Sequence, residues 1–375
     1  MKNKLLNSED FRCKAQKKLP GMVFDYLEGG ADDEVGLKHN RSVLDAIRFK
    51  PKRLINVKNR SIGSSFLGGS FSAPIAIGPT GLNGMLSPDG DFKLARAAAR
   101  ANIPFALSTA SNASIEDIAK VSDGELWFQL YVVHRDLAKQ MVERALKAGY
   151  KTLILTVDVS INGFRERDIR NGFSVPFQYT LKSIIDGALH PDWSLNFMLR
   201  GAPELANFKI ADVSNLEVQA ALMSRQMDAS FNWQDLTWLR DIWPHRLLVK
   251  GITSTEDAAR CADLGVDGVI LSNHGARQLD SCISPVEILE ETASAINIPV
   301  LVDSGFRRGA DVVKALALGA TAVLIGRPVL YALAAEGEAG VDHMLQLLKN
   351  DIDRTLAHIG CADINTVDKS FLSLK

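Results

Sequence analysis

The chain of 375 residues contains no run of about 18 apolar residues, so the sequence predicts no segment that spans a membrane. Its first residues, MKNKLLNSEDFRCKAQKK, include no apolar stretch long enough for a secretory signal peptide. A formal net charge of −1 gives no electrostatic case for nucleic-acid binding. The four cysteines form no C-x-x-C pair, which argues against a disulfide framework and a zinc site, and no metal is predicted. These absences indicate a cytoplasmic protein.

Short apolar runs alternate with helical patterns from residue 73 onward. Runs that are apolar on both faces are typical of parallel strands covered by helices. Eight such strands are predicted, at 74–78, 105–109, 126–131, 152–158, 246–251, 268–274, 299–305 and 322–327. Eight strand–helix units are the number in a closed (β/α)8 TIM barrel, which we favour over an open doubly wound sheet.

Two regions interrupt the repeat within what we expect to be a single domain, 1–375. Residues 1–70 form a helical N-terminal extension and connector, and the barrel occupies 73–335. An insertion at 159–231 follows the fourth strand and is far too long for a plain connection, so we expect a lid or binding element there. A C-terminal helix and tail take up 336–375.

The carboxyl ends of the predicted strands are polar or glycine. In a TIM barrel these ends meet on one face, where the chemistry takes place. Each residue taken singly could be an ordinary strand-end residue, but so many together at one face predict a shared ligand, because buried polar groups need partners. These residues are Pro79, Thr80, Gly81, Ser108, Gln129, Tyr131, Thr156, Asp158, Lys250, Ser272, His274, Asp303, Gly326 and Arg327.

Glycine-rich turns with arginines follow the last two strands, in DSGFRRG (303–309) and IGRP (325–328). Barrels commonly bind a phosphate at this position through backbone N–H groups and charged side chains. Neither a G-x-x-x-x-G-K-[ST] loop nor a G-x-G-x-x-G turn after a strand is present. The sequence therefore predicts a phosphate group held by barrel loops.

Motifs along nearly the whole chain resemble the family of FMN-dependent α-hydroxy acid oxidases and dehydrogenases. They are YLEGGADDE (26–34), GPTGLNG (78–84), LSTASN (107–112), WFQLYV (127–132), LTVD (155–158), LSNHGARQLD (271–280), DSGFRRG (303–309) and IGRPVLY (325–331). GPTGLNG, RQMDASFNW (225–233) and DSGFRRG are most similar to the branch that oxidises (S)-mandelate. The resemblance implies FMN as cofactor, oxidation of an (S)-2-hydroxy acid to the 2-keto acid, and a homotetramer. The alternative within the family is an L-lactate dehydrogenase or a glycolate-type oxidase that uses O₂.

The resemblance also implies roles for the side chains that bind and oxidise the substrate. His274 is expected to take the α-proton or the hydroxyl proton, as suits a base near neutral pH. Asp158 is expected to pair with its imidazole. Arg277 and Arg165 are expected to bind the substrate carboxylate through planar guanidinium groups, although Arg165 could be a surface residue. Tyr26 and Tyr131 are expected to donate hydroxyl hydrogen bonds to the substrate.

The other site residues are assigned to the cofactor by the same resemblance. Lys250 is expected at the N1–C2 carbonyl edge of the flavin, where it would stabilise the reduced ring, and a Schiff-base lysine is the alternative. Pro79, Thr80, Gly81, Ser108, Gln129, Thr156 and Ser272 are expected at the ring and ribityl chain. Asp303, Ser304, Gly305, Arg307, Gly326 and Arg327 are expected at the ribityl and phosphate groups.

Three residues depart from the commoner pattern of the family. Ala276 replaces a glycine, and it would cost about 1 kcal/mol and could shift Arg277 if the position needs a positive φ. Ser304 also replaces a glycine. Gly81 stands where many relatives have alanine beside the flavin, and the missing methyl could admit a bulkier substrate.

The insertion contains an apolar stripe with helical spacing at Leu181, Ile184, Ile185, Ala188 and Leu189, which Pro191 is expected to end. The stripe favours a lid or subunit contact by pattern alone, since most apolar stripes face protein. The resemblance instead implies that 177–215 lies on the inner face of the cell membrane and gives access to a quinone acceptor. Two other hypotheses stay open: a flavin-free barrel enzyme, such as a phosphate-ester isomerase or Schiff-base aldolase, and a catalytically silent ligand-binding barrel.

Overall fold

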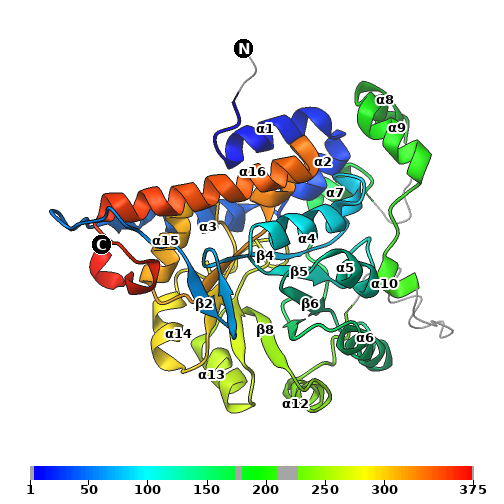
Figure 1. Ribbon diagram of the computed structural model, residues 1–375. Helices are drawn as coiled ribbons and strands as arrows, with labels where there is room; N and C mark the ends of the chain where they lie inside the picture. Colours follow the sequence, from blue (N-terminus) through cyan, green and yellow to red (C-terminus); the bar gives the residue numbers. More distant parts are fainter. Residues whose placement is uncertain (1–3, 174–179, 210–226, 374–375) are drawn as a thin grey trace.

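A closed barrel of eight parallel strands forms the centre of the protein in a computed structural model, which describes residues 4–173, 180–209 and 227–373 (Figure 1). Each strand pairs with the next along the chain, and the last pairs with the first. The strands are β4 (Ile75–Thr80), β5 (Phe105–Ser108), β6 (Leu126–Leu130), β7 (Thr152–Thr156), β8 (Arg246–Ile252), β9 (Gly268–Leu271), β10 (Val300–Val302) and β11 (Ala322–Ile325). The predicted TIM barrel is confirmed, and each strand begins within two residues of its predicted start.

Helices surround the barrel and bury one apolar face each against it. The helices are α4 (Gly90–Arg100), α5 (Ile115–Val121), α6 (Arg135–Lys147), α12 (Trp233–Ile242), α13 (Thr255–Asp263), α14 (Leu289–Ala295), α15 (Gly309–Ala317) and α16 (Arg327–Ile359). Ser114, Asn232 and Ser254 accept backbone N–H groups at the starts of α5, α12 and α13, as favoured capping residues do. The short 3-10 helix η1 (Asn83–Met85) follows β4.

The N-terminal extension packs on the outside of the barrel and closes its lower end. Its helices are α1 (Ser8–Lys18), α2 (Gly21–Glu28) and α3 (Val35–Ala46), and α1 lies along α16 (Figure 1). The hairpin of β2 (Ser64–Phe66) and β3 (Gly69–Phe71) inserts two phenylalanine rings beneath the barrel, where Phe66 packs edge-on against Trp127. Near the C-terminus of the chain, two short 3-10 helices, η2 (Ile364–Thr366) and η3 (Lys369–Phe371), precede β12 (Leu372–Ser373). This strand pairs with β1 (Arg48–Phe49).

The described part of the insertion forms four helices: α7 (Glu166–Arg170), α8 (Leu181–Leu189), α9 (Pro191–Arg200) and α10 (Ala206–Lys209). The predicted stripe does form a helix that ends before Pro191, but this proline also begins α9, because its fixed φ suits a first helical turn. The two helices make a hairpin at the edge of the molecule (Figure 1). Parts of the predicted membrane segment 177–215 and of RQMDASFNW lie outside the described residues. In the described ranges, no helix is long and apolar enough to cross a bilayer.

Candidate active site

A pocket opens at the carboxyl ends of the strands, where the sequence places the candidate residues. Of the predicted site residues, all but Asp158, Gln129 and Ser272 line it. The lining residues among them are Tyr26, Pro79, Thr80, Gly81, Ser108, Tyr131, Thr156, Arg165, Lys250, His274, Arg277, Asp303, Ser304, Gly305, Arg307, Gly326 and Arg327. Asp158, Gln129 and Ser272 hydrogen-bond to lining residues from one layer behind.

His274 lies between a carboxylate and a phenol. Its Nδ1 is 2.9 Å from Oδ1 of Asp158, and its Nε2 is 3.3 Å from the hydroxyl of Tyr131. Burial opposes ionisation of Asp158, but His274 and Lys250 outweigh it and lower the pKa of this carboxyl. Oδ2 of Asp158 is buried without a hydrogen-bond partner among the described residues. An ionised Asp158 that accepts Nδ1–H leaves the lone pair of Nε2 facing the pocket, as a general base requires.

The turn that carries His274 has an unusual left-handed backbone. His274, Gly275 and Ala276 have φ of 58°, 63° and 58°. The condition under which Ala276 was expected to cost stability is therefore met, since an alanine at positive φ is strained. The guanidinium of Arg277 nevertheless lines the pocket.

Hydrogen bonds from behind hold this turn in place. The side chain of Asn273 accepts the N–H of Ala276 at 3.1 Å, and Oγ of Ser304 accepts the N–H of Gly275 at 3.0 Å. Asn273 forms a reciprocal amide pair with Asn40 on α3, with distances of 3.0 and 2.8 Å. The N-terminal extension thus supports the catalytic loop directly.

Arg277 and Arg165 both lie close to the ring of Tyr26, which stacks on Phe173. Nη1 of Arg277 donates to the carbonyl oxygens of Tyr26 and Gly29, both at 2.8 Å. The two guanidinium carbons lie 5.2 and 5.5 Å from the centroid of the Tyr26 ring. Arg165 therefore lies in the pocket, and the surface interpretation is wrong.

Carboxylates neutralise only part of the positive charge of these arginines: Nε of Arg165 pairs with Asp168 at 3.3 Å, whereas the described hydrogen bonds of Arg277 go to backbone carbonyls. Burial and the neighbouring Arg165 and Arg327 lower the pKa of Arg277 to about 9, which still leaves it a cation at neutral pH. Arg327 is likewise buried, and its described hydrogen bonds go to backbone carbonyls. An anionic ligand would offset this excess of charge, because buried cations need a counter-charge.

Lys250 is buried at the end of β8 with two polar partners. Its Nζ donates to Oγ of Ser272 at 2.7 Å and lies 3.0 Å from Oδ2 of Asp303. Burial acts to lower the pKa of this lysine, but Asp303 and Asp158 outweigh it and raise the pKa. A Schiff-base lysine has to be neutral to react, so this environment disfavours the aldolase alternative.

The pocket floor and its far end suit a flat ring joined to a phosphate. Gln129 links Oγ of Ser108 and Oγ1 of Thr156 at 2.9 and 3.0 Å. Gly305 has φ of 88°, and a Cβ there would lie 2.9 Å from the backbone of α3. The space around Gly326 is open, with no atom within 4 Å of an added Cβ. Glycine turns, arginines and a buried lysine are the donor set that FMN needs, so the residues present fit this cofactor.

One wall of the pocket is apolar and was not predicted residue by residue. Val133, Leu205, Phe208 and Met227 line it. Met227 lies in RQMDASFNW, so that motif gave a usable signal, whereas Leu205 and Phe208 are isolated in the insertion. A methyl group added to Gly81 would come within 3.0 Å of Cβ and the carbonyl oxygen of Ala110.

Comparisons with known proteins agree with this geometry. The profile of the FMN-dependent dehydrogenase family matches residues 15–374. The chain is 62% identical to (S)-mandelate dehydrogenase of Pseudomonas putida over 372 residues, which cover 99% of this chain and 95% of that protein. It is 40% identical to L-lactate dehydrogenase of Pseudomonas syringae pv. syringae (strain B728a), with 98% of each chain covered. A crystal structure of the monotopic membrane protein (S)-mandelate dehydrogenase superposes with a TM-score of 0.96 at 61% identity and covers 100% of both chains.

Proposed function

Because this chain belongs to the family of FMN-dependent dehydrogenases, we propose that it oxidises (S)-mandelate to benzoylformate and passes the electrons to a membrane acceptor. FMN-dependent oxidation of an (S)-2-hydroxy acid is its activity, and the aromatic substrate, the residue roles and the acceptor are what we propose. The observation that carries the proposal is the pairing of His274 with Asp158 beside Arg277 and Arg165, two partly buried arginines that line the same pocket.

The substrate carboxylate binds between Arg277 and Arg165. Both guanidinium groups lie close to Tyr26 and both residues line the pocket, where a carboxylate would accept their N–H groups and offset their charge. Burial raises the pKa of Tyr131, so its phenol stays protonated and donates a hydrogen bond to the substrate hydroxyl oxygen. Tyr26 closes the pocket from the N-terminal side.

His274 then takes a proton from the substrate at Nε2. The charge that forms on the imidazole lies 2.9 Å from the ionised Asp158, which stabilises it. When bound, FMN accepts two electrons from the substrate carbon. Lys250 stays cationic in its buried position and balances the negative charge that arises on the cofactor side of the pocket.

An aromatic substrate is favoured by the apolar wall. Val133, Leu205, Phe208 and Met227 offer a surface for a phenyl ring, whose burial contributes about 25 cal/mol per Å². The methyl group of lactate, or the hydrogen in its place in glycolate, would leave this wall without a partner.

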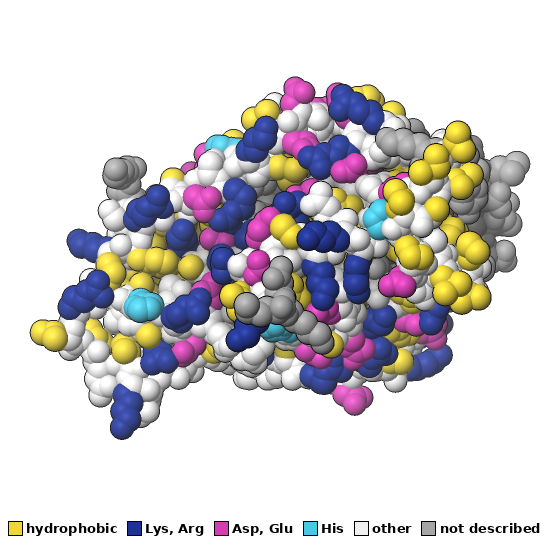
Figure 2. Space-filling view, turned by 90° about the horizontal axis from the view of Figure 1, so that it is seen from above, with side chains coloured by type: hydrophobic (Ala, Val, Ile, Leu, Met, Phe, Trp, Pro, Cys, Tyr) yellow, Lys and Arg dark blue, Asp and Glu magenta, His cyan; other side chains and the backbone are white. Residues whose placement is uncertain are grey.

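The membrane proposal rests on the outer face of the α8–α9 hairpin. Its exposed apolar side chains are Leu181, Ile184, Ile185, Leu189, Leu195, Met198 and Leu199. Figure 2 shows hydrophobic side chains gathered at the end of the molecule where the hairpin lies. Contiguous exposed apolar surface marks an interaction site. We therefore propose that the hairpin lies on the cell membrane. That it lies on the inner face, that a quinone is the acceptor and that the assembly is a homotetramer are proposals that rest on the family resemblance alone.

Product analysis tests the proposed substrate. Purified, FMN-loaded protein is incubated with (S)-mandelate, (R)-mandelate, L-lactate or glycolate, with ferricyanide as acceptor and without O₂. We expect benzoylformate from (S)-mandelate in proportion to the ferricyanide reduced, and no product from (R)-mandelate. Faster formation of pyruvate or glyoxylate would show that the chain acts on aliphatic acids instead.

A further inference from the structure

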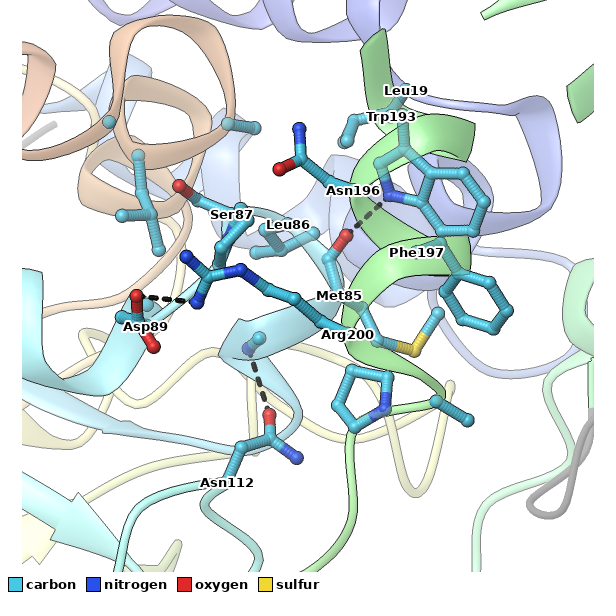
Figure 3. Close-up of a pocket in the computed structure, with 18 of the residues that line it drawn as sticks. Leu19, Met85, Leu86, Ser87, Asp89, Asn112, Trp193, Asn196, Phe197 and Arg200 are labelled. Atoms are coloured by element: carbon cyan, nitrogen blue, oxygen red, sulfur yellow. Dashed lines mark hydrogen bonds and ion pairs between the residues drawn. The ribbon is translucent and has the colours of Figure 1, made fainter. Parts of the chain in front are cut away.

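A second groove lies beside the cofactor pocket, between α9 and the chain that follows β4 (Figure 3). Its volume is about 1330 Å³, which is ample for an extended ligand. Trp193, Asn196, Phe197 and Arg200 line it from α9, and residues 84–92 line it from the opposite side. Nothing in the oxidation of the substrate uses this space.

The wall of the groove on α9 is aromatic and fixed. The rings of Trp193 and Phe197 are stacked, with centroids 4.9 Å apart and planes at 18°. The indole N–H of Trp193 donates to the carbonyl oxygen of Met85 at 2.7 Å, as Figure 3 shows. Arg200 forms an ion pair with Asp89 at 2.7 Å. An aromatic wall held in this way suits a flat, conjugated ring.

The groove and the cofactor pocket share part of their lining. Leu86 and Leu205 belong to both cavities, and Leu86 is buried. Leu86 directly follows η1, which itself begins three residues after Thr80 in the cofactor pocket. A ring bound at this end of the groove therefore lies one layer of side chains away from the cofactor.

The other face of α9 carries the exposed Leu195, Met198 and Leu199 that we place on the membrane. A molecule dissolved in the bilayer would reach the groove along this helix without passing through water. Lys17 and Lys18 line the groove at the end of α1, where they would face polar ring oxygens.

We propose that this groove binds a lipid-soluble quinone, with its ring against Trp193 and Phe197 and its alkyl tail directed toward the α8–α9 hairpin. The proposal rests on the proposed function, since it places the acceptor of the same reaction. Each oxidation of a 2-hydroxy acid to a 2-keto acid releases two electrons and two protons, which reduce one quinone to one quinol. When bound, FMN would relay these electrons from the substrate to the quinone and would be regenerated in each cycle.

Two matched variants of the FMN-loaded protein test the groove. Asn196→Trp fills it from α9, whereas Val121→Trp introduces the same ring at an exposed position on α5, outside the groove and the hairpin. Turnover with decylubiquinone is compared with turnover with ferricyanide. We expect the ratio of the two to fall about tenfold or more in Asn196→Trp, which corresponds to about 1.4 kcal/mol of lost binding. In Val121→Trp the ratio should stay close to that of the unmodified protein.

Photolabelling supplies a readout that does not depend on turnover. An azido derivative of decylubiquinone is crosslinked to the FMN-loaded protein, and the labelled peptides are identified by mass spectrometry. We expect label in 83–92 and 191–200 that excess decylubiquinone removes, and little label in Asn196→Trp. Label confined to the cofactor pocket, or equal quinone turnover in both variants, would overturn the proposal that the groove binds quinone. The proposal would also be overturned if (S)-mandelate bleached the flavin of the unmodified protein but the protein never reduced decylubiquinone. That result would not contradict the proposed substrate. Failure of the bleaching itself would instead refute the proposed function.

Discussion

The protonation states of individual side chains in the active site depend on neighbouring charges of opposite sign. Asp158 stays ionised in a buried position because His274 and Lys250 are close, and Lys250 stays cationic because Asp303 and Asp158 are close. Removing one member leaves another buried charge without its partner, which is costly. Each of these residues should therefore affect both the rate and the cofactor environment.

Asp158→Asn tests the proposed role of the carboxylate. The amide keeps nearly the same shape but cannot stabilise a protonated imidazole, so we expect flavin reduction to slow by about 10²- to 10⁴-fold. Stopped-flow absorbance with saturating (S)-mandelate measures the rate, and Asp241→Asn at an exposed position serves as the control. A rate within about threefold of the unmodified protein would exclude this role for Asp158.

Asp91 gives a prediction for stability against pH. It is buried at the start of α4, accepts hydrogen bonds from Asn83 and Asn112, and burial raises its pKa to about 6. A raised pKa means that the neutral carboxyl stabilises the fold below the unfolded pKa near 4, and that this contribution is lost as the pH rises through about 6.

The free energy of unfolding of the unmodified protein, relative to Asp91→Asn, should therefore fall by up to about 3 kcal/mol between pH 4 and pH 7. Urea denaturation at several pH values measures the difference. Asp89→Asn is the control, since Asp89 lies on the surface and pairs with Arg200. A difference that does not vary with pH would show that folding does not raise the pKa of Asp91.

At the scale of elements, α3 links the two loops that form the site. Asn40 pairs with Asn273 behind the catalytic turn, and the adjacent Arg41 donates to the carbonyl oxygen of Gly305 in the phosphate loop at 2.7 Å. Asp280, from the end of the catalytic loop, accepts the N–H of Gly36 at 2.8 Å in the first turn of α3. The N-terminal extension therefore holds together the turn of His274, which we propose to be the base, and the loop of Gly305, which we propose to bind the phosphate of the cofactor.

Asn40→Ala should weaken this support. It leaves the buried amide of Asn273 without two hydrogen bonds, so we expect a loss of about 1–3 kcal/mol of stability. Because a misplaced base slows catalysis, flavin reduction at saturating substrate should also slow by about tenfold or more. Lys38→Ala, exposed on the same helix, is the control for both denaturation and stopped-flow measurements. A loss of stability with an unchanged rate would show that α3 is only structural.

The strands and the residues at their ends could be predicted because apolar runs and their polar ends are local in the sequence. His274, Lys250 and Asp303 are each visible at the end of a strand. The Asn40–Asn273 pair could not be predicted, since 233 residues separate its members and Asn40 belongs to none of the motifs, although Asn273 lies in LSNHGARQLD. The apolar wall was missed for the same reason: Leu205 and Phe208 come from an insertion whose path only tertiary packing decides.

At the scale of the whole molecule, the hairpin α8–α9 is the element through which we propose that the enzyme docks on the membrane. Its exposed apolar side chains include Leu195, Met198 and Leu199, while other residues of α9 line the groove beside the cofactor pocket. The hairpin would thus connect the membrane to the site of oxidation.

Replacing Leu189 and Leu199 together with aspartate should reduce membrane binding. Each leucine side chain that enters the lipid contributes about 1.5–3 kcal/mol to membrane binding. Partition of the double variant onto lipid vesicles should therefore fall by about tenfold or more. Flotation with phosphatidylglycerol and phosphatidylcholine vesicles measures the bound fraction. Val121→Asp, an exposed apolar residue on α5, is the control. Equal flotation of the double variant and the control would show that the hairpin does not dock on lipid.

The visible spectrum of the bound flavin, recorded without O₂, tests the central claim most directly. The purified protein is mixed with (S)-mandelate, with (R)-mandelate and with glycolate in separate experiments. We predict prompt bleaching by (S)-mandelate, none by (R)-mandelate, and slow bleaching at most by glycolate. A flavin that (S)-mandelate leaves oxidised, or that glycolate bleaches faster, would contradict the proposed oxidation of an aromatic 2-hydroxy acid.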